Sequence, residues 1–310
     1  MNDFLEKQPS PWYSLMMLLV YTFAFSIGIQ LLVLMLGELT NSSAIGFMQG
    51  NNSPESLGGN SRFFMYALLA SGTFGTFYLP SVFLQKREPL HTYFPIEKTV
   101  PMFYVLAVAI LVAFSPMMEL IGEWNAQMTL PESLKGVENW MRTQEDASND
   151  LIKKVVMVDH IGLLFVNIIV FAVFPAVAEE YFFRGSLMHI LNRIFKNIHV
   201  TICVTAIIFS AIHVQFFGFF PRVILGAFFG YMLIWTNNIR VPILAHFVNN
   251  AIVTVLAFYY TTQGKTFEEL QTFDSYSIFV YLGSFMLTAV IAVLFYKKSK
   301  SNINNGEGLD

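Results

Sequence analysis

The stretch Ala178–Gly185, Ala-Glu-Glu-Tyr-Phe-Phe-Arg-Gly, places three ionisable side chains at the end of an uncharged apolar run over residues 161–178. Ionisable groups at membrane depth are costly, so they usually face a protein interior or a wet cavity and mark a function. On a helix, Glu180 and Arg184 lie at i and i+4 and can form an ion pair. Glu179 points about 100° away from Glu180 and is free for another role. The stretch predicts either a buried structural pair or part of a functional site.

The composition places most of the chain in lipid. Of the 310 residues, 55% are hydrophobic and 13% are charged, whereas soluble domains carry about 25% charged residues. The sequence lacks the alternating segments of about ten residues that mark an outer-membrane barrel. A net charge of -3 provides no basic surface for nucleic acid, and the single cysteine, Cys203, cannot form an intrachain disulfide. We therefore expect an all-α, polytopic membrane bundle.

The length of the apolar runs divides this bundle into about eight transmembrane segments. A hydrocarbon core about 30 Å thick requires about 20 apolar helical residues. The hydrophilic stretch 122–159 contains weakly amphipathic parts at 133–142 and 150–158, which we expect on the membrane surface, and we expect residues 184–197 to lie along the interface. The expected membrane helices are residues 12–37, 62–85, 100–121, 160–182, 199–213, 222–236, 241–260 and 275–296.

Two of these segments, 199–213 and 222–236, are each only about 15 residues long, or roughly 22 Å of helix. The connector between them, Val214–Pro221, carries no charge. Backbone polar groups cannot face lipid unpaired, so a turn inside the bilayer must be buried against protein. Whether the two segments form such a re-entrant hairpin is left open by the sequence.

The distribution of Lys and Arg orients the bundle, because cytoplasmic loops carry the excess of these residues. We expect both termini in the cytoplasm and a multi-pass location in the cell membrane, the inner membrane of a bacterium. The expected cytoplasmic side holds Lys7, Lys86, Arg87, Lys98, Arg193, Lys196, Arg240, Lys297, Lys298 and Lys300. The opposite side holds Arg62, Lys135, Arg142, Lys153, Lys154, Arg222 and Lys265.

Polar side chains that can do chemistry come from three separate apolar segments. Glu179 comes from the first, His213 from the second, and His246 with Asn250, at i and i+4, from the third. A lone intramembrane histidine is usually a structural hydrogen-bonding group. Several such groups buried together must find partners, and we expect them to meet around water in a polar intramembrane cavity.

Two hydrolytic chemistries fit this set. In the first, Glu179 deprotonates a water as general base, His213 positions that water or relays the proton, and His246 and Asn250 donate to the oxyanion. In the second, Glu179, His213 and His246 bind zinc and leave its fourth position to the water. No His-Glu-x-x-His motif supports zinc, no Gly-x-Ser-x-Gly surrounds Ser210, and the membrane segments carry no pair of Asp.

Three ordered motifs resemble those of the CPBP (Abi) family of intramembrane endopeptidases. They are Glu179-Glu180-x-x-x-Arg184, Phe209-x-x-x-His213 and His246-x-x-x-Asn250. The family contains type II CAAX prenyl proteases and lysostaphin-resistance-protein-A-like and bacteriocin-immunity proteins. The resemblance implies Glu179 as catalytic base, with His213, His246 and Asn250 completing the site. It implies supporting roles for Glu180 and Arg184.

The motifs divide the chain into residues 1–159, with N-terminal helices and an amphipathic loop, a CPBP-like core at 160–260, and a last helix with a cytoplasmic tail at 261–310. We expect an intramembrane endopeptidase acting on a membrane-associated or lipidated protein, with no cofactor unless zinc is bound. The alternatives are a non-catalytic immunity or scaffold protein and a proton-coupled transporter. We place the following residues outside the site, as interfacial, solvated or snorkelling: His91, His160, His189, His199, Glu119 and Arg222. Asn249 points about 100° away from Asn250.

Overall fold

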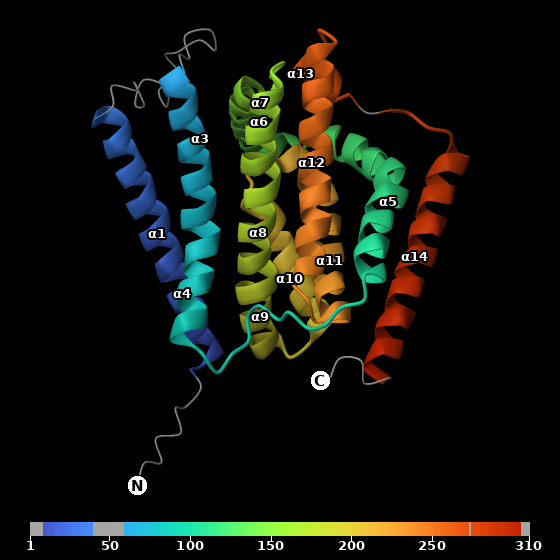
Figure 1. The fold of residues 1–310 in the computed structure, drawn as a ribbon. Coiled ribbons are helices and arrows are strands. Elements are labelled where there is room, and N and C mark those ends of the chain that lie inside the picture. The colour runs from blue at the N-terminus through green and yellow to red at the C-terminus, as the bar shows by residue number, and fades with distance from the viewer. Residues whose placement is uncertain (1–8, 40–58, 273, 305–310) are drawn as a thin grey trace.

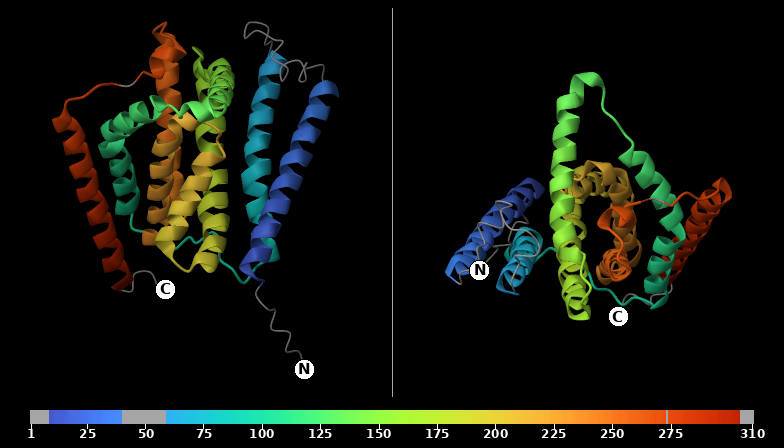
Figure 2. Two further views of the ribbon diagram at one scale, coloured as in Figure 1. Left: turned by 180° about the vertical axis from the view of Figure 1, so that it is seen from behind. Right: turned by 90° about the horizontal axis from the view of Figure 1, so that it is seen from above.

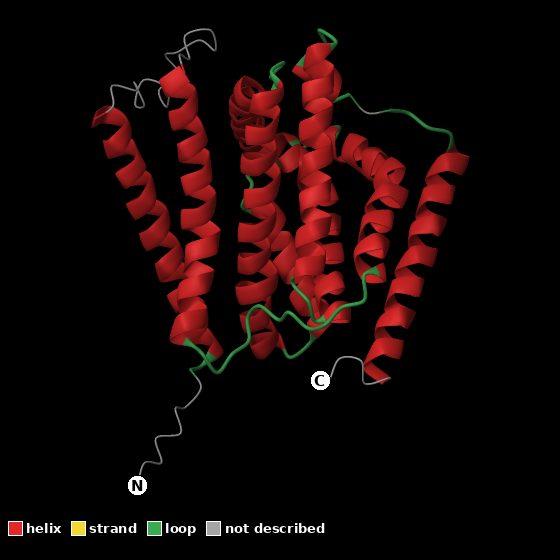
Figure 3. Cartoon of the chain, viewed as in Figure 1, coloured by secondary structure: helices red, strands yellow, loops and turns green. Residues whose placement is uncertain are grey.

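The described residues of this computed structural model, 9–39, 59–272 and 274–304, form helices joined by loops, with no strand among them (Figures 1 and 3). This confirms the all-α membrane bundle. Seven helices are long and apolar enough to cross a membrane, and one further apolar helix is shorter. The seven cover Pro11–Leu39, Arg62–Arg87, Met102–Ala126, Ile161–Phe195, Phe216–Thr236, Arg240–Thr262 and Ile278–Ser301.

Shorter elements make up these spans, and their bounds follow in chain order. The first half of the chain contains α1 (Pro11–Leu39), α3 (Gly59–Thr73), the π-helical η2 (Phe74–Tyr78), α4 (Leu79–Arg87), α5 (Met102–Ala126), the 3-10 helix η3 (Glu132–Leu134) and α6 (Lys135–Val156). The central span contains α7 (Ile161–Asn167), the π-helical η4 (Ile168–Val173), α8 (Phe174–Glu180), the π-helical η5 (Tyr181–Leu187) and α9 (Met188–Phe195). The remainder contains α10 (Ile198–Ala211), the 3-10 helix η6 (Phe216–Gly218), α11 (Phe219–Thr236), α12 (Arg240–Thr262), α13 (Phe267–Leu270) and α14 (Ile278–Asn304).

Two expectations about these elements are corrected. Residues 184–197 do not form a separate interfacial helix, because the helix from Ile161 continues to Phe195. The polar side of α9 faces protein: Arg193 hydrogen bonds to the Pro9 carbonyl and to Ser14 Oγ. The two weakly amphipathic pieces, 133–142 and 150–158, are replaced by the single helix α6, which lies across one end of the bundle (Figures 1 and 2).

The expected count of about eight segments corresponds to these seven spans and α10, which has only 14 residues and spans about 21 Å. Glycines allow α11 to pack closely against it: a Cβ on Gly226 would lie 3.1 Å from Ala206 Cβ, and one on Gly230 would lie 3.0 Å from Ile202 Cγ2. Small residues at such contacts are how membrane helices approach each other. The two helices thus form a tight antiparallel hairpin.

Protein groups cover the turn of this hairpin. The amide of Phe217 donates to Glu145 on α6 over 3.0 Å, and the amide of Phe220 donates to Asn125 Oδ1 over 2.9 Å. Asn125 Nδ2 also donates to the Phe216 carbonyl, over 3.0 Å. These bonds satisfy backbone groups that lipid cannot satisfy, so α5 and α6 fix the position of the turn.

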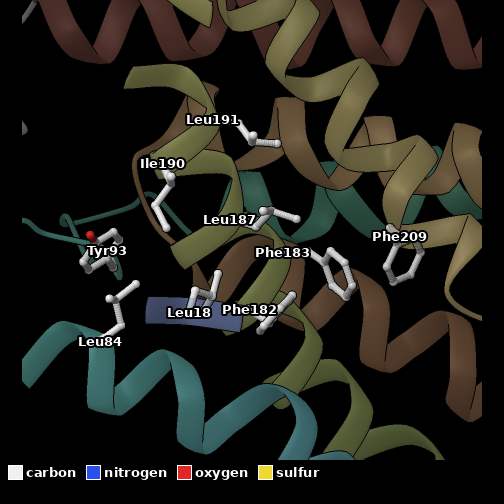
Figure 4. Packing of buried hydrophobic residues seen from close by; sticks show 9 residues of the cluster. All are labelled: Leu18, Leu84, Tyr93, Phe182, Phe183, Leu187, Ile190, Leu191 and Phe209. Carbon is white, nitrogen blue, oxygen red and sulfur yellow. The ribbon is translucent and has the colours of Figure 1, made fainter. Parts of the chain in front are cut away.

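A buried apolar cluster joins α1, α4, η5, α9 and α10 toward the end of the bundle where both described ends of the chain lie (Figures 1 and 4). Phe183 and Phe209 meet edge to face at this cluster, with ring centroids 5.1 Å apart. The cluster lies next to Arg184, so it supports the charged residues from that side. Its members are Leu18, Leu84, Tyr93, Phe182, Phe183, Leu187, Ile190, Leu191 and Phe209.

Candidate active site

The helix that carries the acidic pair changes its winding on both sides of it. The π-helical segment η4 precedes Pro175, which has no backbone N–H to donate, and the π-helical segment η5 begins directly after Glu180. π-helical turns inside α-helices are frequent at functional sites. Glu179 and Glu180 therefore lie on a short α-helical segment between two irregular ones.

Glu180 is at the centre of a buried polar network. Its Oε1 accepts a hydrogen bond from Arg184 Nη1 over 2.9 Å, and the two side chains are 0% and 1% exposed. Arg184 Nη2 donates to the Gly226 carbonyl over 3.1 Å, and its guanidinium lies 4.5 Å from the ring of Phe209. The i, i+4 pair indicated by the sequence is present, and it connects α8 to α10 and α11.

His246 is held by the same carboxylate. Its Nδ1 lies 2.9 Å from Glu180 Oε1, and the ring of Phe229 stacks on it at 5.2 Å. A carboxylate oxygen accepts, so the proton on this edge of the ring is on Nδ1. His246 Nε2 then faces away from Glu180, toward Glu179.

Glu179 lies between two imidazoles. Its Oε2 is 4.0 Å from His213 Nε2 and 3.9 Å from His246 Nε2. These gaps are too long for direct hydrogen bonds, and polar groups at such separations are commonly bridged by water. The His213 ring is oriented by its Nδ1, which donates to the Phe209 carbonyl over 2.7 Å. Both imidazoles thus turn Nε2 toward one carboxylate oxygen.

Asn250 lies one turn beyond His246 on α12 and lines the same cavity. Its Oδ1 accepts a hydrogen bond from Asn249 Nδ2 over 3.2 Å. The structure gives Asn250 Nδ2 no partner among the described residues, so this amide can donate into the cavity. Asn249, which the sequence turns about 100° away from Asn250, also lines the cavity and orients Asn250.

The cavity has a volume of about 770 Å³ and extends well beyond these residues. It reaches Arg222, which is not snorkelling but donates to the Gln215 side chain over 2.8 Å and to the Gln215 carbonyl over 3.2 Å. It also reaches Glu119, which the sequence placed at the interface. Both residues sit in apolar runs, and periodicity alone does not show which face of a helix borders a cavity.

The remaining histidines lie elsewhere. His91 is buried, 8% exposed, rather than solvated, and its ring packs against His189 at 5.3 Å. His160 accepts a hydrogen bond from the Gly162 amide at the start of α7, and His199 pairs with the Tyr231 hydroxyl over 2.8 Å. None of these four histidines borders the cavity.

The possible zinc ligands, Glu179, His213 and His246, have the wrong spacing for zinc. Tetrahedral bonds of about 2.0–2.1 Å place ligand atoms roughly 3.4 Å apart, which is shorter than both separations from Glu179 Oε2. The described part of the chain contains no group of three His, Cys, Asp or Glu side chains arranged to hold a metal ion. We therefore derive no step through a metal.

The fold and this site define a polytopic membrane protein that gathers a carboxylate, two imidazoles and an amide inside its helix bundle. Residues 161–252 match the family model described as type II CAAX prenyl endopeptidase Rce1-like, so this segment is a domain of that family, and the resemblance in the motifs is confirmed. No curated protein and no solved structure matches the chain. Membership of this endopeptidase family implies an intramembrane protease with a peptide substrate.

Proposed function

We propose that the chain is an intramembrane endopeptidase that hydrolyses a peptide bond of a membrane-associated or lipidated protein with a water activated by Glu179. The observation that supports this most is the placement of Glu179 Oε2 about equally far from His213 Nε2 and His246 Nε2, at 4.0 and 3.9 Å. One water can bridge such gaps, and it would lie at the inner end of a cavity large enough for a peptide segment.

The ring orientations assign different tasks to the two histidines. His213 Nδ1–H donates a hydrogen bond to the Phe209 carbonyl, so Nε2 of the neutral ring accepts a hydrogen bond from the water. Glu179 accepts the other hydrogen and takes it as general base. The oxygen then attacks the scissile carbonyl, and Glu179 returns the proton to the amide nitrogen as the C–N bond breaks. The products are a new carboxyl group and a new amine.

The oxyanion formed in this attack requires donors. Asn250 Nδ2 is one of them. His246 Nδ1–H donates a hydrogen bond to Glu180 Oε1, so its Nε2 donates only when the ring is an imidazolium. That charge would lie between Glu179 and Glu180, and together with Arg184 it would make the four-residue cluster neutral. A preorganised, neutral cluster of this kind stabilises developing charge without exposing net charge to lipid.

The membrane orientation is part of the proposal. Both described ends of the chain lie at one end of the bundle (Figure 1). That end carries most of the Lys and Arg residues of the short loops, which favours a cytoplasmic location for both termini in a cell membrane. The basic residues there are Lys86, Arg87, Lys98, Arg193, Lys196, Arg240, Lys297, Lys298 and Lys300.

The experiment that tests the function compares membrane peptides from cells that express the chain with those from cells that express Glu179→Gln. New peptide termini that occur only with the unsubstituted chain, quantified by mass spectrometry, would support proteolysis and identify substrates. Identical sets of termini at equal expression would favour the non-catalytic immunity or scaffold alternative. His199→Gln is the matched control, because His199 lies outside the cavity and this variant should leave the new termini unchanged.

A further inference from the structure

The cavity has a direction within the bundle. From Glu179, His213 and His246 it extends past the second half of α5 to Asn149 on α6 and to Gln271, just after α13. Helices α6 and α13 lie at the end of the bundle opposite to the one where both described ends of the chain, the start of α1 and the end of α14, lie (Figures 1 and 2). The cavity therefore opens at the end of the bundle that carries α6 and α13, away from the start of α1 and the end of α14.

The other end is closed by packed side chains. Below the acidic pair, Arg184 is enclosed by the rings of Phe209 and Phe229, at 4.5 and 5.3 Å. A second buried cluster, of Met188, Ile202, Leu233 and Ile239, lies further toward the termini. These layers separate the site from the end of the bundle where the chain begins and ends.

The loop at the closed end is also fixed in place. The Ile239 amide donates to the Pro95 carbonyl over 2.9 Å, and the Glu97 amide donates to the Asn237 carbonyl over 3.2 Å. Asn238 Nδ2 donates to Thr99 Oγ1 over 2.9 Å. Two loops distant in sequence are thus bonded to each other across this end.

The two ends also differ in charge. The acids among the described residues at the closed, basic end are Glu88 and Glu97. The open end is acidic, with Glu38, Glu119, Glu123, Glu132, Glu138, Glu145, Asp146, Asp150, Asp159, Glu268, Glu269 and Asp274. Its basic residues are Arg62, Lys135, Arg142, Lys153, Lys154 and Lys265. The excess of Lys and Arg favours a cytoplasmic location for the closed end.

We infer that the active-site cavity opens on the extracytoplasmic face of the membrane, so that its substrates are peptide segments of exported or membrane-anchored proteins presented from that side. The inference rests on the proposed function for the substrate and on the proposed membrane orientation for the side, whereas the end of the bundle at which the cavity opens follows from the fold. A peptide in the cytoplasm would meet the sealed, basic end. A peptide on the outside would meet an acidic rim, which favours segments carrying Lys or Arg.

Thiol labelling tests the direction independently of activity. The only cysteine is removed as Cys203→Ala, and single cysteines are introduced as Gln271→Cys at the open end and Lys98→Cys at the closed end; both positions are exposed. A membrane-impermeant maleimide added to intact bacterial cells should label Gln271→Cys at least ten times faster than Lys98→Cys. Permeabilised cells should label both at similar rates. Labelling of Lys98→Cys alone in intact cells would overturn the inference.

A second measurement tests the substrates. A charged, quenched fluorescent peptide built on a cleavage site found with the unsubstituted chain is added to sealed vesicles of either orientation. Right-side-out vesicles should cleave it, and inside-out vesicles should cleave it at least ten times more slowly until detergent is added. Faster cleavage by inside-out vesicles would overturn the inference and leave the protease proposal standing. No cleavage even in detergent would reject the protease proposal, while the labelling still decides the direction.

Discussion

Arg184→Met is the substitution whose consequence follows most directly from the structure. It removes the guanidinium that donates to Glu180 over 2.9 Å and to the Gly226 carbonyl over 3.1 Å, but it keeps an apolar stem of similar length between the aromatic rings. Glu180 is left fully buried as a carboxylate with His246 as its remaining partner. Removing one partner of a buried ion pair costs about 3–5 kcal/mol.

The assay is reversible denaturant unfolding in detergent, followed by tryptophan fluorescence, with the double variant Glu180→Met/Arg184→Met as matched control. The double variant has no uncompensated charge, so its loss should be smaller, about 1–3 kcal/mol for the unpaired Nδ1–H of His246. Activity should be lost in both variants, because His246 is no longer oriented. An unfolding free energy for Arg184→Met within about 0.5 kcal/mol of the unsubstituted chain would refute this reasoning.

Three further predictions concern the hairpin, the end-lying helix and the metal. Gly226→Ala should lower activity and cost about 1–3 kcal/mol of stability, because its Cβ would lie 3.1 Å from Ala206 Cβ and 3.3 Å from Phe209 Cδ1; Gly136→Ala, in open space on α6, is the control and should lose neither. The backbone amide of Leu130, with Arg142 and Lys135, holds the pKa of the Glu138 carboxyl at about 2, below its ordinary value. The stabilisation of α6 by Glu138 is therefore full above about pH 4.5 and lost as the pH falls toward 2; hydrogen exchange of α6 should rise over that range and depend less on pH in Glu138→Gln. Exhaustive chelation should leave kcat/KM unchanged, and restoration of activity by stoichiometric zinc alone would contradict the base mechanism.

Much of the fold follows from the lengths of the apolar runs. The runs that begin near residues 12, 62, 100 and 241 are long enough to cross a bilayer, and each became a helix within a few residues of its expected bounds. The lengths of the apolar runs did not predict that the central helix continues to Phe195. An amphipathic stretch with Arg193 is compatible with the membrane interface and with a buried position, and the contacts of Arg193 with Ser14 and Pro9 are tertiary.

The candidate site likewise has one feature that the sequence predicts and others that depend on tertiary packing. The i, i+4 spacing indicates the pairing of Glu180 with Arg184, since both residues lie on one helix. The sequence does not indicate that His246 bonds to Glu180 rather than Glu179, because α8 and α12 meet only through packing. Nor does it indicate that Asn249 orients Asn250, because neighbouring residues on a helix point in different directions.

The central claim is that Glu179 activates the water. Its most direct measurement is the rate of peptide cleavage by purified Glu179→Gln beside the unsubstituted chain, at equal thermal stability. Loss of a general base lowers the rate by about 10²–10⁴-fold, and we predict a decrease in kcat of at least 100-fold with the fold intact. Cleavage by the amide variant at the unsubstituted rate would contradict the account.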